Sequence, residues 1–385
     1  MYKKDDERMT VTTPPMGWNS WNTFGKDINE ELILKTAEFI AESGLKDCGY
    51  DYVVIDDCWA EKERDENGNL RADQEKFPNG IKYIADKIHS MGLKLGIYSC
   101  AGPLTCAGYP GSYEREFKDA ALFASWDVDF LKYDYCYHSE IMHGKLLFRR
   151  MGAALASSGR DILFSACTGG LDETAQWIKS ANAQMWRSTP DIMDNWSSVK
   201  SIIYAQEQYL STNGNGCFND MDMLIVGMNG KGNVGLGGCN FEEYKTHFTA
   251  WAFFGSPLFI GCDIINMDDK AKQILTNKDV IAVNQDKAYL QPYRIGIKRM
   301  NNDERLIFVR QLEKGDFAIL ILNMSDEKQF MCFMPDELGL SLCCHKTLKL
   351  KDLWTKEEHI MKNEIYKTML DPHGCQLLRA KITDI

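Results

Sequence analysis

The sequence lacks several features that would place it in common classes of protein. It contains 13 cysteines but no CxxC pair, so the usual zinc-binding spacing is absent. No run of about 18 apolar residues occurs, which argues against a membrane-spanning helix. No basic block stands out and the net charge is -11, so neither nucleic acid nor an anionic membrane is expected as a partner.

A leader for export is also not visible. The first residues, MYKKDDERMTVTTPP, carry charge but no apolar stretch of the kind that secretory signals contain. The expected location of the chain as written is therefore the cytoplasm, or outside the cell if a signal has been lost. The sequence leaves open whether the chain forms a homo-oligomer.

What the sequence does contain is enough apolar material for a large core. Its 385 residues are 44% hydrophobic, which suits one barrel-sized domain and a smaller one. Eight strand-like runs alternate with amphipathic helical segments, as parallel βα units do. These runs are Pro15–Asn19, Tyr50–Asp57, Lys94–Cys100, Val128–Tyr135, Asp161–Cys167, Ala183–Ser188, Cys217–Leu224 and Ser256–Cys262.

This pattern predicts an α/β fold, a (β/α)8 TIM barrel over residues 1–291. A doubly wound open sheet is the alternative, but no Gly-rich phosphate loop follows the first run. From about residue 292 the pattern changes to short runs such as RLIFVRQL and DFAILILNM, separated by polar turns. Residues 292–385 are therefore predicted to form a C-terminal antiparallel β-sandwich domain.

The most informative run is VDFLKYDYC, Val128 to Cys136. Because side chains alternate along a strand, Lys132 and Asp134 share one face and come last on it. Charges at the exit of an apolar strand are costly unless they are paired or used. One interpretation is structural: Lys132 and Asp134 form a buried ion pair. The other is functional: both residues belong to an active site, which in a (β/α)8 barrel forms at this end of the strands.

Polar and aromatic side chains also follow the other predicted strands. A single aspartate there is more often a helix N-cap or a solvated loop residue, and we keep that interpretation for Asp194. Carboxylates from several strands at one end are harder to explain, because like charges held close destabilise a fold. The set comprises Trp18, Trp21, Asp56, Asp57, Trp59, Tyr98, Arg187, Asp191, Asp194, Asp220 and Asp222.

Two carboxylates that flank a bond, together with aromatic faces and side chains that bind hydroxyl groups, suit a glycosidase. Clustered aspartates can also hold Mg²⁺, and the sequence does not exclude this use. We expect no cofactor and no metal. A carbohydrate-binding barrel without catalysis is the alternative from another class.

At this point several motifs resemble one family, glycoside hydrolase family 27, which contains α-galactosidases and α-N-acetylgalactosaminidases. The resemblance runs from about Thr13 to Asp286, and eight motifs follow in order. They are TPPMGWNSWNTFG, YDYVVIDDCW, LGIYSCAG, CAGYPGS, LKYDYC, WRSTPDIMDNW, NDMDML and IAVNQD.

The resemblance implies a retaining exo-glycosidase that hydrolyses terminal α-D-galactosyl residues of an oligosaccharide or glycoconjugate. It implies Asp134 as the nucleophile and Asp191 as the acid/base. It also implies that Cys106 and Cys136 can form a disulfide, which a reducing cytoplasm would disfavour. The positions that hold the sugar in the family match Trp21, Asp56, Asp57, Tyr98, Lys132, Arg187, Asp222 and Met223.

Two departures from the family bear on the substrate. Where many members have Cys-Glu-Trp, this chain has Cys167, Thr168 and Gly169. We expect Thr168 near the 2-position of the sugar, where its small size leaves room for an N-acetyl group. α-N-Acetylgalactosaminidase and β-L-arabinopyranosidase activities are therefore alternatives. The second departure is a Gly-rich segment, residues 228–240, which is either a lid or subsite loop or an ordinary surface loop.

Overall fold

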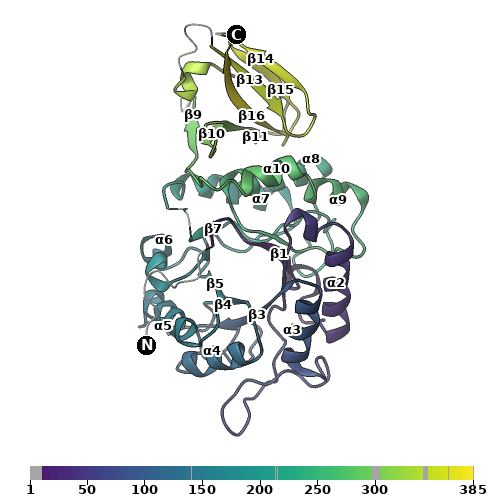
Figure 1. The fold of residues 1–385 in the computed structure, drawn as a ribbon, viewed down its shortest axis with the longest axis vertical. Helices are drawn as coiled ribbons and strands as arrows, with labels where there is room; N and C mark the ends of the chain where they lie inside the picture. The colour runs from purple at the N-terminus through teal and green to yellow at the C-terminus, as the bar shows by residue number, and fades with distance from the viewer. Residues whose placement is uncertain are drawn as a thin grey trace.

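The computed structural model describes residues 11–139, 141–212, 214, 216–296, 304–340, 346–362 and 364–384. Figure 1 shows a ring of strands and helices in the first part of the chain and a smaller stack of strands in the last part. No helix among these residues is both long enough and apolar enough to cross a membrane.

The ring is a sheet of eight parallel strands in the spatial order β7-β6-β5-β4-β3-β2-β1-β8. Beyond β7, the Leu224 amide donates to the Phe259 carbonyl over 2.7 Å, which joins this segment to β8 and completes the ring. The strands are β1 (Met16–Asn19), β2 (Tyr52–Val54), β3 (Lys94–Cys100), β4 (Phe130–Asp134), β5 (Leu163–Cys167), β6 (Met185–Arg187), β7 (Phe218–Asp220) and β8 (Leu258–Ile260). The predicted (β/α)8 barrel is confirmed.

Helices cover the outside of the ring. In α2, the Asn29 side chain accepts the Leu32 amide over 2.9 Å at the N-terminus, and Ile33, Ala37 and Ile40 are buried against the barrel. Burial of each large apolar side chain stabilises the fold by about 1.5–3 kcal/mol. The helices are α1 (Trp21–Phe24), α2 (Glu30–Glu42), α3 (Gly80–Ser90), α4 (Glu116–Ser125), α5 (Gly144–Ser157), α6 (Thr174–Trp177), α7 (Trp196–Ala205), α8 (Phe241–Phe254), α9 (Asp269–Leu275) and α10 (Lys278–Asn284).

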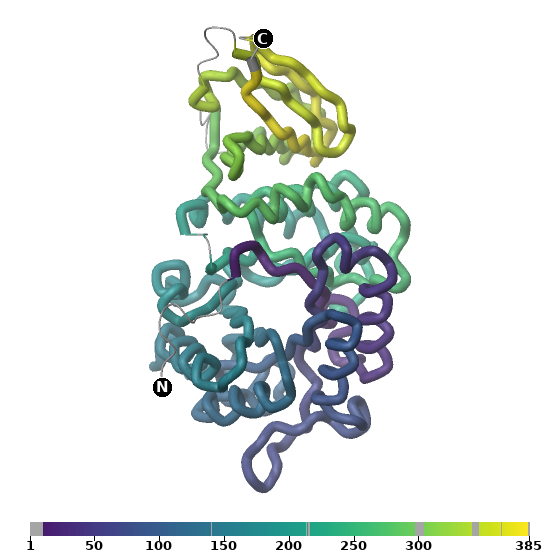
Figure 2. The backbone as a smooth tube through the Cα atoms, in the orientation of Figure 1, coloured from purple at the N-terminus to yellow at the C-terminus, as the bar shows by residue number. Residues whose placement is uncertain are grey.

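The interior of the barrel is filled by large apolar side chains. Phe130 packs against both Tyr52 and Phe259, with ring centroids 5.6 and 5.3 Å away. Trp18 was predicted near the rim, but this prediction is wrong: the side chain is buried in the core and its Nε1 donates to the Cys262 carbonyl. Because the interior is largely packed, the active-site pocket of this barrel lies at the carboxyl ends of the strands. Figure 2 shows the long segment between β2 and α3 projecting away from the ring.

The C-terminal part consists of two antiparallel sheets, with strand orders β14-β13-β16-β11-β10-β9 and β12-β15. Apolar side chains from both sheets, such as Val309 and Phe333, form one buried cluster between them. Helix α8 packs on this part, with Phe254 and Phe308 ring centroids 5.2 Å apart. The strands are β9 (Tyr293–Ile295), β10 (Arg305–Gln311), β11 (Phe317–Asn323), β12 (Gln329–Phe333), β13 (Lys346–Asp352), β14 (Glu358–Met361), β15 (Tyr366–Leu370) and β16 (Cys375–Asp384).

Candidate active site

One pocket lies at the carboxyl ends of the barrel strands. Of the eleven residues that the sequence predicts to be catalytic or to bind the sugar, ten line this pocket, and Thr168 does not. The pocket is lined by Trp21, Asn22, Asp56, Asp57, Tyr98, Cys106, Lys132, Asp134, Cys167, Arg187, Asp191, Ile192, Asp222, Met223 and Val234. Sequence reasoning did not place Asn22, Ile192 or Val234 there.

Asp134 ends β4 and is held by two hydrogen bonds. The Tyr135 amide donates to its Oδ1 over 2.8 Å, and the Tyr98 hydroxyl donates to its Oδ2 over 2.9 Å. Burial raises the pKa of the Asp134 carboxyl, while the Lys132 charge and these two donors lower it. The carboxylate is therefore fixed in position, and its ionised form is supported from several sides.

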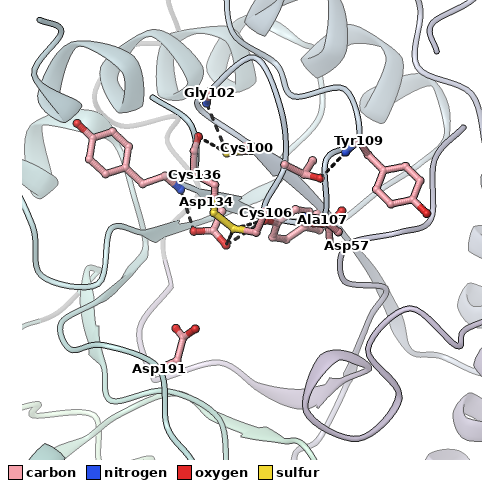
Figure 3. The surroundings of a disulfide bond; sticks show 12 residues. Asp57, Cys100, Gly102, Cys106, Ala107, Tyr109, Asp134, Cys136 and Asp191 are labelled. Atoms are coloured by element: carbon pink, nitrogen blue, oxygen red, sulfur yellow. Dashed lines mark hydrogen bonds between the residues drawn. A yellow bond between two sulfur atoms is a disulfide. The ribbon is translucent and has the colours of Figure 1, made fainter. Parts of the chain in front are cut away.

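A disulfide lies directly beside this carboxylate. Cys106, in the loop after β3, is bonded to Cys136, which follows β4, and Figure 3 shows the bond next to Asp134. The Cys106 sulfur is 3.6 Å from Asp134 Oδ2. The two loops approach so closely that a Cβ on Gly102 would lie 2.0 Å from the Cys136 carbonyl oxygen. The disulfide and this contact fix the wall of the pocket at the nucleophile position.

Lys132 forms an ion pair with Asp56 and not with Asp134. Its Nζ lies 2.8 Å from Asp56 Oδ2, which also accepts from Asn19 Nδ2 over 2.7 Å. The alternative interpretation, a buried Lys132–Asp134 ion pair, is therefore not what the structure has, because the chain after β2 brings Asp56 to the lysine. Asp57 is fixed separately, by the Ala107 amide over 3.0 Å.

Arg187 holds the opposite side of the pocket. Its Nη2 contacts both Asp191 and Asp222, the latter at 2.9 Å. The Arg187 charge lowers the pKa of Asp191, whose side chain is 82% exposed. Asp222 is 4% exposed, and burial raises its pKa. In Figure 3 the Asp191 side chain faces Asp134 across the open space.

Thr168 does not line this pocket, contrary to the expectation that it lies near the sugar. Its side chain is buried, and its hydroxyl shares a hydrogen bond of 2.6 Å with that of Thr174. The next residue, Gly169, has φ +61°. A Cβ built on Gly169 would have the Thr189 carbonyl oxygen, at 3.7 Å, as its one neighbour within 4 Å. The side chain that β5 presents to the pocket is Cys167. Strand alternation puts Cys167 and Thr168 on different faces, a signal that could have found this.

The Gly-rich segment 228–240 forms a fixed wall of the pocket. Asp194 was predicted as an N-cap or a solvated loop residue, but this prediction is wrong, because Asn195 caps α7 and Asp194 is 0% exposed. Its carboxylate accepts from the Gly230 amide over 2.6 Å and from the Tyr244 hydroxyl over 2.9 Å. Its own amide donates to the Val234 carbonyl over 3.0 Å. These bonds explain how Val234 is held in the pocket wall.

Replacing Asp194 with alanine is expected to lower the free energy of unfolding by about 2–4 kcal/mol, because the Gly230 amide and the Tyr244 hydroxyl lose their acceptor in a buried site. Chemical denaturation measures this change. Asp269, exposed in α9, supplies the matched control, and Asp269→Ala is expected to change stability by less than about 0.5 kcal/mol. Equal effects of the two changes would contradict the anchoring role of Asp194.

At the strand ends of this barrel, two carboxylates face each other and buried cations lie beside them. This arrangement is typical of glycoside hydrolases. The chain belongs to the α-galactosidase family. Residues 13–286 match the family model described as "Alpha galactosidase A", and residues 302–380 match the one described as "Alpha galactosidase C-terminal beta sandwich domain".

Individual relatives agree with this assignment. The chain is 42% identical to an α-galactosidase of Cyamopsis tetragonoloba over 95% of this chain and 85% of the relative. It is similar to the crystal structure of α-galactosidase I from Mortierella vinacea, with a TM-score of 0.90, 35% identity and coverage of 97% and 98% of the two chains. It is also similar to an α-galactosidase from Saccharomyces cerevisiae solved with raffinose, with a TM-score of 0.87, 29% identity and coverage of 97% and 98%.

Proposed function

We propose that this protein hydrolyses terminal α-D-galactosyl residues of oligosaccharides or glycoconjugates with retention of configuration. One observation carries the proposal: Asp134 and Asp191 line the same pocket in different electrostatic surroundings. Burial raises the pKa of Asp134, and the Arg187 charge lowers that of Asp191. A retaining glycosidase needs two carboxylates that face the same sugar. The pKa directions describe the free site, so the positions in the family motifs, and not these directions, assign Asp134 as the nucleophile and Asp191 as the acid/base.

In the first step Asp134 attacks the anomeric carbon while Asp191 gives its proton to the glycosidic oxygen. The leaving group departs as an alcohol, and a covalent glycosyl-enzyme forms at Asp134. In the free protein the Arg187 charge favours ionised Asp191. A bound substrate covers this exposed side chain, and the loss of water raises its pKa toward the protonated form that the step needs.

In the second step a water molecule takes the place of the leaving group. Asp191, now ionised, removes a proton from this water, and the oxygen attacks the anomeric carbon. The bond to Asp134 breaks and its carboxylate is restored. Two inversions at the same carbon leave the released sugar with its original configuration.

The residues that bind the sugar are assigned in the same proposal. Asp56 and Asp57, both buried, would accept hydroxyl groups of the hexose, including O6, which a pentopyranose such as arabinose lacks. The Lys132 and Arg187 cations would donate to hydroxyl oxygens. Trp21 and Tyr98 line the same pocket with aromatic faces. These contacts favour galactose over arabinose.

α-N-Acetylgalactosaminidase is the second candidate, because the chain after β5 presents no large side chain to the pocket. Thr168 is turned away, and Gly169 and Gly170 follow it. The space near Cys167 therefore decides whether a 2-acetamido group fits.

The test compares p-nitrophenyl α-galactoside with its 2-acetamido analogue and with p-nitrophenyl β-L-arabinopyranoside. We expect the α-galactoside to have the highest kcat/KM. Proton NMR of the early product should show α-galactose before mutarotation. Faster turnover of the acetamido analogue would reverse the assignment of the substrate, and early β-galactose would contradict retention. Turnover of none of the three would favour a binding protein.

A further inference from the structure

A small cavity lies beneath the candidate active site, inside the barrel. Its volume is about 30 Å³, which is room for about two water molecules. Lys132, Cys167, Arg187, Asp222 and Met223 line both this cavity and the pocket above it. The other lining residues are Asn19, Phe130, Ser165, Met185, Asp220 and Phe259.

Asp220 is the carboxylate in this cavity to which the mechanism above gives no role. It ends β7, and its Cα is paired with that of Arg187 on β6. The Asp222 amide donates to its Oδ1 over 2.9 Å. Within the described residues, no ion pair joins Asp220 to Arg187 or Lys132, although both cations line the same cavity. Burial raises the pKa of Asp220 to about 6, against the opposing effect of Arg187.

The groups that face Asp220 come from five neighbouring parts of the barrel. The cations are Lys132 on β4 and Arg187 on β6, and the second carboxylate is Asp222, just after β7. The neutral polar groups are the amide of Asn19 on β1, and the Ser165 hydroxyl and Cys167 thiol on β5. Arg187 connects Asp220 with the proposed acid/base. It lines the cavity together with Asp220, and its Nη2 contacts Asp191.

We propose that Asp220 is a positioning residue that sets the proton affinity of Asp191 through the charge of Arg187. An ionised Asp220 offsets part of the guanidinium charge, so that Arg187 attracts the Asp191 carboxylate less strongly. A neutral Asp220 leaves the full charge acting on Asp191. The inference rests on the proposed function, since it assigns Asp191 as the proton donor.

The sign of the effect follows from this arrangement. Replacing Asp220 with asparagine removes a negative charge that is present above pH 6 or so, and this lowers the pKa of Asp191 in the enzyme–substrate complex. Because kcat for a poor leaving group needs protonated Asp191, the basic limb of its pH profile moves to lower pH. We expect a shift of about half to one pH unit. At about pH 5 and below, Asp220 is mostly neutral and the two proteins should agree.

The experiment measures kcat at saturating raffinose from about pH 4 to 9 for the wild type and Asp220→Asn. α-Galactosyl azide is the comparison substrate, since azide leaves without a proton and its basic limb should not move. Ser165→Ala, which changes the same cavity without changing charge, is the matched variant and should keep the wild-type profile. Asp220→Glu should return the basic limb toward its wild-type position.

An equal loss of kcat at every pH, with both limbs unmoved, would overturn the role of Asp220 and leave it structural. A shift of the same size with α-galactosyl azide would also overturn it, because that step needs no acid. If Asp220→Asn does not fold, Asp220→Ser makes the same comparison. Failure of the proposed function is distinguishable, since the wild type would then turn over neither substrate.

Discussion

Replacing Asp134 with asparagine is expected to lower kcat/KM for p-nitrophenyl α-galactoside about ten-thousandfold or more. An amide cannot form the glycosyl-enzyme, so the double displacement loses its first step. The fold should persist, because the change removes a buried charge. It also removes one of the two acceptor oxygens that Tyr98 and Tyr135 use, which costs about 1 kcal/mol.

Thermal unfolding with calorimetry checks the second part of this prediction, and steady-state kinetics the first. A 2-deoxy-2-fluoro galactosyl donor with a good leaving group adds a direct test. It should label the wild type at Asp134, and peptide mass spectrometry should locate the label. A label on another carboxylate, or an Asp134→Asn protein with ordinary activity, would refute the nucleophile assignment.

Replacing Asp191 with alanine is expected to lower kcat/KM for raffinose by about a hundredfold to ten-thousandfold, the usual contribution of a general acid. For substrates whose leaving group needs no proton, kcat/KM should fall much less. The reason is the position of Asp191, whose exposed carboxylate lies in the pocket wall beside Ile192 and opposite Asp134.

Added azide distinguishes the roles of the two carboxylates, because each variant is expected to give a different azide product. In Asp191→Ala, azide can enter the space left by the base and attack the glycosyl-enzyme, which yields α-galactosyl azide. In Asp134→Ala, azide replaces the nucleophile itself, and a single inversion yields β-galactosyl azide. The opposite pairing of variant and product would exchange the two roles. Asp194→Ala is the control for the loop, since it leaves both carboxylates in place and should give neither azide product.

Much of the fold was predictable because its signals are local. Asn29 caps α2, and Gly44, with φ +90°, follows its end, and both are residue types that capping rules favour at these places. Each of the eight predicted runs contains a barrel strand. The sequence reasoning did not identify β9, β14, β15 or β16 of the C-terminal sheets. β15 pairs with β12, and β16 pairs with β11, strands that are not next to them along the chain. β9 and β14 do pair with the neighbouring strands β10 and β13, but they have only 3 and 4 residues, too few for a clear alternating pattern.

The site was predictable where one strand carries the signal. Strand alternation placed Lys132 and Asp134 on one face, and both line the pocket. It did not identify the partner of Lys132, because Asp56 is 76 residues away in sequence. Asp194 shows the same limit: a motif that resembles a helix start gave no sign that the Gly-rich segment folds over this residue and buries it.

By itself, the sequence determined the barrel, the sandwich that follows it, the family and the residues gathered at the strand ends. These follow from periodicity and motifs, which depend on neighbours along the chain. The tertiary structure alone decided which charges pair. Lys132 pairs with Asp56, and Arg187 pairs with both Asp191 and Asp222. Asp220, among the described residues, forms an ion pair with neither of these cations. Closing the ring of strands sets those distances, and electrostatic interactions depend on distance in space and on burial.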